Sequence, residues 1–258
     1  MGERELDGRV VVVFGAGSSG RGLSNGEAAA LAYARAGAVV VAVDRDAAEA
    51  RRVAKEITAD GGVALAVTAD VTVEADVAAA VEAVVAAFGP PHVLHNNVGA
   101  SILGDLTATD LATWNHGLAV NLTSAYLTCR YTVPHMLAAG RGAIVNVSSL
   151  AAIRDTGYVY PVYSAAKAGL NQLTVSLALT HARAGLRANA VLPGLIDTPM
   201  AAGQVTADAA ARHAASPTGR MGSPHDVANA SVFLASDRAA YVNGVCLPVD
   251  GGLSARSA

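Results

Sequence analysis

The sequence has few of the features that mark a secreted, membrane-spanning or nucleic-acid-binding protein. Only 15% of its 258 residues are charged, and the formal net charge is −3. The two cysteines, Cys129 and Cys246, lie far apart and form no C-x-x-C pair. Two such thiols predict a cytoplasmic protein without disulfides. Scattered arginines in a mildly acidic chain argue against a nucleic-acid partner.

Long apolar runs are also missing, although 52% of the residues are hydrophobic. The longest apolar stretches, such as 10–14 and 38–43, have the length of strands and stop at Gly or Asp. A membrane-spanning helix needs roughly 20 apolar residues, so we expect no membrane partner. The charged first residues contain no apolar segment typical of a secretory signal. The apolar excess instead predicts a parallel sheet buried under alanine-rich helices.

Apolar segments of strand length alternate with helical segments along the whole chain. We predict strands near 9–14, 38–43, 63–67, 91–95, 142–147, 187–192 and 245–249, and helices near 26–36, 46–60, 73–88, 105–138, 161–183 and 224–235. This alternation predicts an α/β protein in which residues 1–258 form one Rossmann-fold domain, with a seven-stranded parallel sheet and helices on both faces. Residues 194–223 fit no element, and we expect them to form a mobile lid over the substrate.

A glycine-rich segment from Gly15 to Gly26 follows the first predicted strand and opens a helix. Glycines in this place let the backbone approach a pyrophosphate held by N–H groups at the helix start. Asp44 ends the second strand. A carboxylate in this place accepts hydrogen bonds from the ribose hydroxyls of the cofactor. It also repels a 2′-phosphate, by about 4 kcal/mol for charges roughly 4 Å apart. We therefore predict NAD as the cofactor, although Arg45 leaves pairing with a phosphate open.

Tyr163 and Lys167 lie four residues apart at the start of a predicted helix, so their side chains share one face. The chain has only two lysines, Lys55 and Lys167, and uses Arg elsewhere. A compact ammonium kept at this place suggests the role of a point charge. Such a charge favours phenolate and lowers the pKa of a phenol that is ordinarily about 10. The spacing alone is usually incidental.

The remaining motifs give this pair its meaning. In order along the chain they are the glycine-rich loop, Ala69-Asp-Val71, Asn96-Asn-Val-Gly99, Asn121, Asn146-Val-Ser-Ser149, Tyr163-x-x-x-Lys167, Pro193-Gly194 with Thr198, and 241–252. Over essentially its whole length, the sequence resembles the compact branch of the short-chain dehydrogenase/reductase family.

This resemblance implies a role for each matching side chain. Tyr163 is expected to be the general acid/base, and Lys167 to lower its pKa and hold the nicotinamide ribose. Ser149 is expected to bond the reacting oxygen, while Asn121 positions a water that links Lys167 to solvent. Hydride then passes directly between the nicotinamide ring and the carbinol carbon, with no metal. Ser148 competes with Ser149, which fits the family spacing better.

The resemblance also implies a set of cofactor-binding residues, to which Asp44 and Arg45 are added from their place after the second strand. Asp70 and Val71 would face the adenine, and Asn97 to Gly99 the adenosine ribose. Thr198, near Ile196, would bind the carboxamide. The full set is Gly15, Gly17, Ser24, Asn25, Gly26, Asp44, Arg45, Asp70, Val71, Asn97, Val98, Gly99, Tyr163, Lys167, Pro193, Gly194, Ile196 and Thr198.

The glycine-rich loop departs from the family pattern. Phe14 replaces the usual Thr, and Ser24-Asn25-Gly26 stands where the final Gly-x-Gly is expected. Counts from the strand and from the helix disagree by about four residues. We therefore infer a loop insertion between Gly17 and Ser24.

These observations predict an NAD-dependent oxidoreductase that acts on a secondary alcohol or its ketone. An NADPH-dependent ketone or 3-oxoacyl reductase remains the alternative, and a dinucleotide sensor without turnover is disfavoured by the intact catalytic set. The seven histidines form no ligand cluster, so we expect no metal site. Small residues in 150–160 and 195–220 suggest a modest neutral substrate. The resemblance and the small residues of the 161–183 helix suggest a homotetramer.

Overall fold

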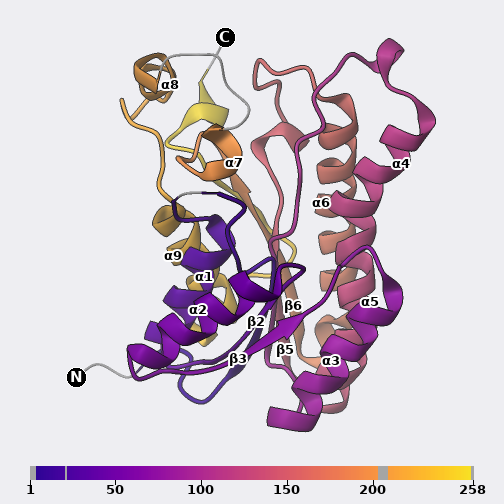
Figure 1. Cartoon of the computed structure of the whole chain (residues 1–258), viewed down its shortest axis with the longest axis vertical. Coiled ribbons are helices and arrows are strands. Elements are labelled where there is room, and N and C mark those ends of the chain that lie inside the picture. The colour runs from indigo at the N-terminus through magenta and orange to yellow at the C-terminus, as the bar shows by residue number, and fades with distance from the viewer. Residues whose placement is uncertain (1–3, 21, 203–208, 257–258) are drawn as a thin grey trace.

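The computed structural model describes residues 4–20, 22–202 and 209–256, which build one parallel sheet covered by helices (Figure 1). The strands lie in the order β3-β2-β1-β4-β5-β6-β7. Their bounds are β1 Val10–Phe14, β2 Val39–Asp44, β3 Val63–Thr68, β4 Val93–Asn96, β5 Gly142–Val147, β6 Leu186–Pro193 and β7 Cys246–Val249. All neighbouring pairs are parallel. The predicted Rossmann fold is confirmed, and each strand begins and ends within two residues of its prediction.

The helices cover both faces of the sheet. Their bounds are α1 Asn25–Arg35, α2 Ala47–Ala59, α3 Glu74–Phe88, α4 Leu111–Leu118, α5 Ser124–Ala138, α6 Pro161–His181, α7 Pro199–Ala202, α8 Ala209–Ala215 and α9 Pro224–Ala235. One core cluster joins α1, α2 and α9 to the sheet, and a second joins α3, α5 and α6 to its other face (Figure 1). The strand β1, all five residues of which are buried, lies between the two clusters.

The order of the strands determines where a ligand can bind. The chain moves from β1 to β2 and β3 on one side, and then returns to β4 on the other side of β1. Such a switch point opens a crevice at the carboxyl ends of the strands. The segments that follow β1, β4, β5 and β6 therefore meet at one edge of the sheet.

The single helix predicted for 105–138 is wrong in detail. Residues 106–108 form a short 3-10 turn, and α4 begins only at Leu111, because the Asp110 side chain accepts the Thr113 N–H at 2.7 Å. A π-helical segment, Ala119–Thr123, then joins α4 to α5. Such segments frequently mark functional sites, and this one contains Asn121.

The segment 194–223 contains the short helices α7 and α8 and a bridge between Ile196 and Gly222. Residues 203–208 of the expected lid, and residue 21 of the inferred insertion, lie outside the described residues. Within the described parts of the chain, no helix combines the length and the apolar character needed to cross a membrane.

Candidate active site

A cavity of about 710 Å³ opens at the carboxyl edge of the sheet. Its wall combines segments from the glycine-rich loop, the ends of β4, β5 and β6, the start of α6, α8 and the residues after β7. Eleven residues of the expected site line this cavity: Ser24, Asn25, Asn97, Gly99, Ser149, Tyr163, Lys167, Pro193, Gly194, Ile196 and Thr198. Residues far apart in the sequence are therefore brought to one place.

Tyr163 enters this cavity from the first turn of α6. Pro161 begins that helix, where its missing N–H costs no intrahelical hydrogen bond. The Ser149 hydroxyl faces the phenol of Tyr163 as a hydrogen-bonding group that lowers the pKa of Tyr163. Ser149 itself caps a short turn, in which its Oγ accepts the Ala151 N–H at 3.2 Å.

The structure distinguishes Ser149 from its competitor. The Ser148 side chain is buried, and its Oγ donates to the Lys167 carbonyl oxygen at 3.2 Å. Ser148 thus ties the strand end to α6, whereas Ser149 contacts the phenol. This geometry favours Ser149 for contact with a reacting oxygen.

Lys167 lies one turn further along α6 and is only 2% exposed. Its Nζ donates to the Val147 carbonyl oxygen at 2.8 Å and lies 5.7 Å from the centroid of the Tyr163 ring. Burial penalises the ammonium and lowers the pKa of Lys167 to about 8. The cation is therefore costly to keep, which is unusual for a group with a purely structural role.

The pKa of Tyr163 departs from the sequence-based expectation. Burial raises it to about 12, while the Ser149 hydrogen bond acts in the opposite direction and Tyr160 adds a smaller increase. We expected Lys167 to lower this pKa, and in the structure its charge is not among the causes. The physical reason is that both groups are desolvated and the ammonium bonds a backbone carbonyl instead of the phenol.

Asn121 lies behind the cavity, in the π-helical segment. Its Oδ1 accepts the Ala100 N–H at 3.0 Å, and its Nδ2 donates to the carbonyl oxygens of Ala100 and Gly117, each at 2.9 Å. A Cβ added at Gly99 would lie 3.0 Å from Asn121 Oδ1 and 3.1 Å from Lys167 Nζ. Asn121 and Lys167 therefore flank the same glycine, and a water shared between them stays a prediction.

The glycine-rich loop packs tightly against the start of α1. Gly15 has a φ of +81°, and a Cβ added at Gly26 would lie 1.9 Å from the Gly15 carbonyl oxygen. Asn97 Nδ2 donates to that same oxygen at 3.0 Å. Ser24 caps α1 and donates from Oγ to the Gly17 carbonyl oxygen at 2.7 Å. Glycine is thus required at position 26 by close backbone contact.

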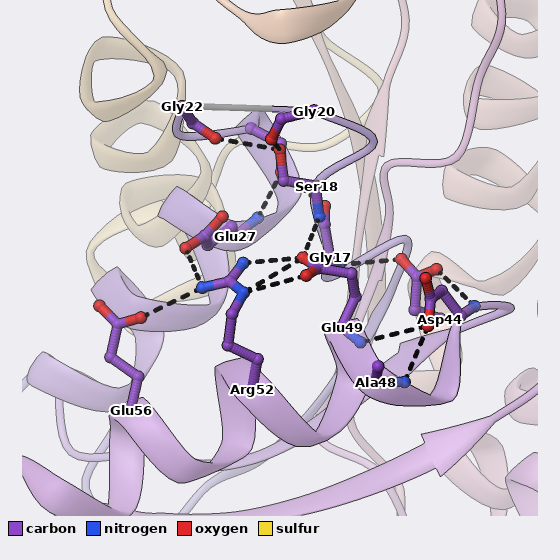
Figure 2. Close-up of polar contacts among 12 residues, drawn as sticks. Gly17, Ser18, Gly20, Gly22, Glu27, Asp44, Ala48, Glu49, Arg52 and Glu56 are labelled. Atoms are coloured by element: carbon purple, nitrogen blue, oxygen red, sulfur yellow. Dashed lines mark hydrogen bonds and ion pairs between the residues drawn. The ribbon is translucent and has the colours of Figure 1, made fainter.

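Two carboxylates hold the beginning of this loop (Figure 2). Asp44 Oδ2 accepts the Gly17 N–H at 2.9 Å, and Glu49 Oε2 accepts the Ser18 N–H at 2.9 Å. Arg52 holds Glu49 through Nε and Nη2 and bonds the buried Glu27 through Nη1 at 2.8 Å. These bonds lower the pKa of Glu49, with Arg52 the largest cause.

Glu49 and Arg52 were not predicted from the sequence as site residues. The only signal in the sequence was the spacing of 49, 52 and 56 on one helix, which is typical of surface ion pairs in general. The contact between α2 and the glycine-rich loop depends on how the two elements are placed by the sheet.

The remaining residues expected at the adenosine end lie outside the large cavity. Asp70 accepts both the N–H and the hydroxyl of Thr72, which lowers its pKa, and the nearby charge of Arg45 contributes. Arg45 itself is exposed. The Val71 side chain is buried in the core, and Val98 packs against Gly15. Their contacts with a cofactor stay predictions.

An aromatic wall borders the cavity beside Tyr163. The rings of Tyr158 and Tyr160 stack with centroids 5.7 Å apart, and Tyr160 meets Tyr163 edge to face at 5.3 Å. The Tyr160 hydroxyl also hydrogen-bonds to Thr156. Tyr158 and Tyr160 both line the cavity.

A buried polar network supports the site from behind. Asn96 Nδ2 donates to Asn146 Oδ1, and Asn146 Nδ2 donates to Thr174 Oγ1, both at 2.8 Å. Thr128 Oγ1 donates to Asn96 Oδ1 at 2.7 Å. The network links β4, β5, α5 and α6, and so fixes the helix that carries Tyr163 and Lys167 relative to the sheet.

Among the described residues, no three His, Cys, Asp or Glu side chains lie close enough together to hold a metal ion.

Comparison with known proteins places the chain in a family. The family model described as enoyl-(acyl carrier protein) reductase matches residues 21–254. The chain is 45% identical to cis-4-hydroxycyclohexanecarboxylate dehydrogenase of Sinomonas cyclohexanicum, over 99% of this chain and 100% of that protein. It is 38% identical to cyclohexanol dehydrogenase of an Acinetobacter species, over 98% and 97% of the two chains.

The solved structures agree with this result. A short-chain dehydrogenase/reductase from Burkholderia xenovorans superposes with a TM-score of 0.95, at 43% identity over the full length of both chains. The chain belongs to the short-chain dehydrogenase/reductase family. It is an NAD(P)-dependent oxidoreductase that interconverts CH–OH and C=O groups, as predicted from its motifs.

Solved members of the family carry either nicotinamide dinucleotide. A structure described as an NAD(P)-dependent gluconate 5-dehydrogenase from Beutenbergia cavernae contains NADP, with 38% identity, a TM-score of 0.91 and coverage of 99% and 100%. A 7α-hydroxysteroid dehydrogenase was solved with NADH, at 29% identity, a TM-score of 0.91 and coverage of 97% and 96%. A nicotinamide dinucleotide is thus the cofactor class for this short-chain dehydrogenase/reductase.

Proposed function

We propose that this protein is an NAD-linked dehydrogenase of ring-shaped secondary alcohols, with Tyr163 as the general acid/base. The observation that carries the proposal is the meeting of Tyr163, Ser149 and Lys167 at one cavity. In the oxidation direction, Tyr163 takes the hydroxyl proton of the alcohol, and Ser149 hydrogen-bonds its oxygen. Lys167 supplies positive charge beside the phenol. When bound, a nicotinamide dinucleotide supplies the carbon that accepts the hydride.

The residues around the glycine-rich loop fit such a cofactor. Asn25 Oδ1 is buried and has no hydrogen-bond partner within the described chain, and Asn25 lines the cavity. Gly26 leaves no space for a side chain, because the Gly15 carbonyl oxygen lies against it, so α1 begins directly beside the loop. Asn25 and Gly26 would hold the pyrophosphate side, while Lys167 and Thr198 would hold the nicotinamide side.

Two carboxylates support NAD over NADP. Asp44 and Glu49 both flank Gly17, because a Cβ added there would lie 2.9 Å from Asp44 Oδ2 and 2.6 Å from Glu49 Cβ. Arg52 holds Glu49 in place (Figure 2). Two negative charges at the ribose end repel a 2′-phosphate more strongly than Asp44 alone. Arg45 is exposed beside Asp70, which offsets only part of this charge.

The aromatic wall supports a cyclic substrate. Tyr158 and Tyr160 offer flat apolar surface beside the phenol of Tyr163, and such surface suits a saturated or steroid-like ring. The relatives named for cyclohexanol and hydroxycyclohexanecarboxylate agree with this proposal. Oxidation of the alcohol is the proposed direction. The cellular NAD pool is mostly oxidised, and family members that use NAD usually work in this direction.

We also retain three broader proposals. Residues 194–223 act as a substrate lid, which the lining of the cavity by Leu195, Met200 and Arg212 supports. A homotetramer forms through α6, whose solvent face includes Ala165, Ala168 and the 74% exposed Leu179. The protein is cytoplasmic, in keeping with its two free cysteines.

Turnover of Tyr163→Phe tests the proposal directly. Phenylalanine keeps the ring contacts but removes the proton-transferring hydroxyl, so NAD affinity should stay within about twofold while alcohol oxidation falls by at least about 10³-fold. Substrate panels should be run with NAD and NADP side by side. Faster turnover with NADPH and ketones would favour the alternative, a ketone or 3-oxoacyl reductase, and an active variant would refute the role of Tyr163.

A further inference from the structure

The cavity wall carries more positive charge than the protein as a whole. The chain has 18 basic and 21 acidic residues, but among the described residues the wall contains, besides Lys167, Arg154, Arg212 and Arg256 against the carboxylate of Asp155 alone. The sequence suggested a neutral substrate because its small residues dominate 150–160 and 195–220. Only the fold shows that arginines from three separate segments surround the same cavity.

These arginines come from the segments that lie over the reacting end. Arg154 follows the turn that contains Ser149, Arg212 lies on α8, and Arg256 follows the turn Leu253–Ala255 after β7. In Figure 1 the last described turn, drawn in yellow, lies beside α8, and a Cβ added at Gly251 would lie 2.8 Å from Ser216 Oγ, which follows that helix. Arg212 and Arg256 thus come from neighbouring segments, and Arg154 lines the same cavity from the segment after β5.

Arg154 and Arg256 have no side-chain hydrogen bond or ion pair in the part of the chain that the structure describes. Arg52 and Arg220, by contrast, pair with Glu49 and Asp226 at 2.9 and 3.0 Å. Arginine presents a rigid fork of donors that matches a carboxylate in a bidentate manner. Two such forks with free donors at a cavity wall therefore favour an anionic ligand.

The cofactor's 2′-phosphate is not the anion that these side chains suit. A 2′-phosphate would lie at the ribose end, near Asp44 and Arg45, and neither residue lines this cavity. Arg154 instead shares its segment with Ser149 and with Tyr158 and Tyr160 of the aromatic wall. A ligand between that wall and the arginines would have an apolar ring and a negative charge.

We propose that the alcohol substrate carries a carboxylate on its ring, which Arg154 and Arg256 bind while Tyr163 and Ser149 engage the hydroxyl. This inference rests on the proposed function for the hydroxyl, whereas the recognition of the acid rests on the arginines alone. Asp155 lies next to Arg154 and weakens the attraction. Its removal should therefore strengthen binding of an acid.

A binding measurement separates acid recognition from turnover. We would titrate cyclohexanecarboxylate and cyclohexanecarboxamide, which lack a hydroxyl, into the complex with NADH and follow calorimetric heat. The acid should bind about tenfold more tightly than the amide, and this ratio should fall at high salt. Equal affinities would overturn the proposal.

Matched variants assign the effect to the arginines. Arg154→Gln and Arg256→Gln should each reduce the acid-to-amide affinity ratio several-fold, and the double variant should bring it close to one. Asp155→Asn, which keeps the oxygen that accepts the Gly157 N–H, should increase it. Arg183→Gln is the control, because Arg183 is exposed and follows the far end of α6. An unchanged ratio in the double variant would contradict the proposal.

Two further outcomes are informative. If the double variant lost affinity for NADH and kept its acid preference, the arginines would serve the cofactor and the proposal would be wrong. The same acid and amide with a ring hydroxyl are then tested as substrates. Preferential binding of the acid, without oxidation of either alcohol, would refute the dehydrogenase proposal alone. Equal oxidation of both would refute acid recognition alone.

Discussion

The Lys167 ammonium lies 5.7 Å from the centroid of the Tyr163 ring, yet its hydrogen bond goes to the Val147 carbonyl oxygen. Burial lowers the pKa of Lys167 to about 8 and raises the pKa of Tyr163 to about 12. In the free protein the phenol is therefore protonated near neutral pH, ready to donate its proton to a ketone. We assign the decrease in pKa that oxidation requires to the positive charge of the oxidised cofactor.

The burial of Lys167 predicts a specific dependence of stability on pH. An unfolded lysine keeps its proton up to about pH 10.4, whereas the folded one loses it near pH 8. Between these values the unfolded state binds more protons, so the free energy of unfolding rises with pH. Below pH 8 the cost of the buried charge, about 3 kcal/mol, is fully present.

Lys167→Met removes that cost, so its stability relative to the wild type should be highest at pH 7. Urea unfolding gives the free energy of unfolding of both proteins. Between pH 7 and pH 10, the value of the wild type should rise by about 2–3 kcal/mol relative to that of the variant. Lys55→Met, which changes an exposed lysine on α2, is the control and should show no such shift. A difference independent of pH would contradict the burial of a charged Lys167.

The carboxylates beside Gly17 predict cofactor preference. Glu49→Gln should raise the ratio of kcat/KM for NADP over NAD about tenfold, and adding Asp44→Asn about a hundredfold, because less negative charge opposes a 2′-phosphate. Glu56→Gln is the matched control: Glu56 bonds the same Arg52 at 3.4 Å but makes no hydrogen bond to the described residues of the loop. Equal effects of Glu49→Gln and Glu56→Gln would show that only the general charge matters.

Gly26→Ala tests the close contact under the cofactor. The added methyl would meet the Gly15 carbonyl oxygen at 1.9 Å and Asn97 Nδ2 at 2.5 Å, so the loop must move. We expect NAD affinity to fall at least about tenfold, measured by fluorescence titration with NADH. Gly61→Ala is the control for a glycine replacement that causes backbone strain without a steric clash. Gly61 has a φ of +82°, and an added Cβ has no heavy atom within 4 Å. It should cost about 1 kcal/mol of stability and leave affinity unchanged.

The sequence predicted the fold well because continuous apolar strands alternate with helices, and that pattern has few solutions. It failed at 105–110, where a local cap at Asp110 delays the helix, and it did not anticipate the π-helical segment at Asn121. These features depend on single hydrogen bonds and on packing against α6. Periodicity alone does not record them.

The sequence predicted which residues form the candidate site better than it predicted their pKa values. Tyr163, Lys167 and Ser149 meet as their motifs suggested, but the pKa of Tyr163 is raised because burial outweighs nearby charge. Desolvation depends on every atom around the ring, which no motif contains. The Glu49–Arg52 contacts and the arginines of the cavity wall likewise join segments that only the fold brings together.

The titration of Tyr163 tests the central claim most directly. Phenolate absorbance should be followed against pH for the wild type and for Tyr163→Phe, each with and without NAD, and the variant curve subtracted. We predict that the difference without NAD shows no phenolate below about pH 11, as a pKa of about 12 requires. With NAD it should show one phenolate titrating at least about two pH units lower. A difference curve that NAD leaves unmoved would contradict the account.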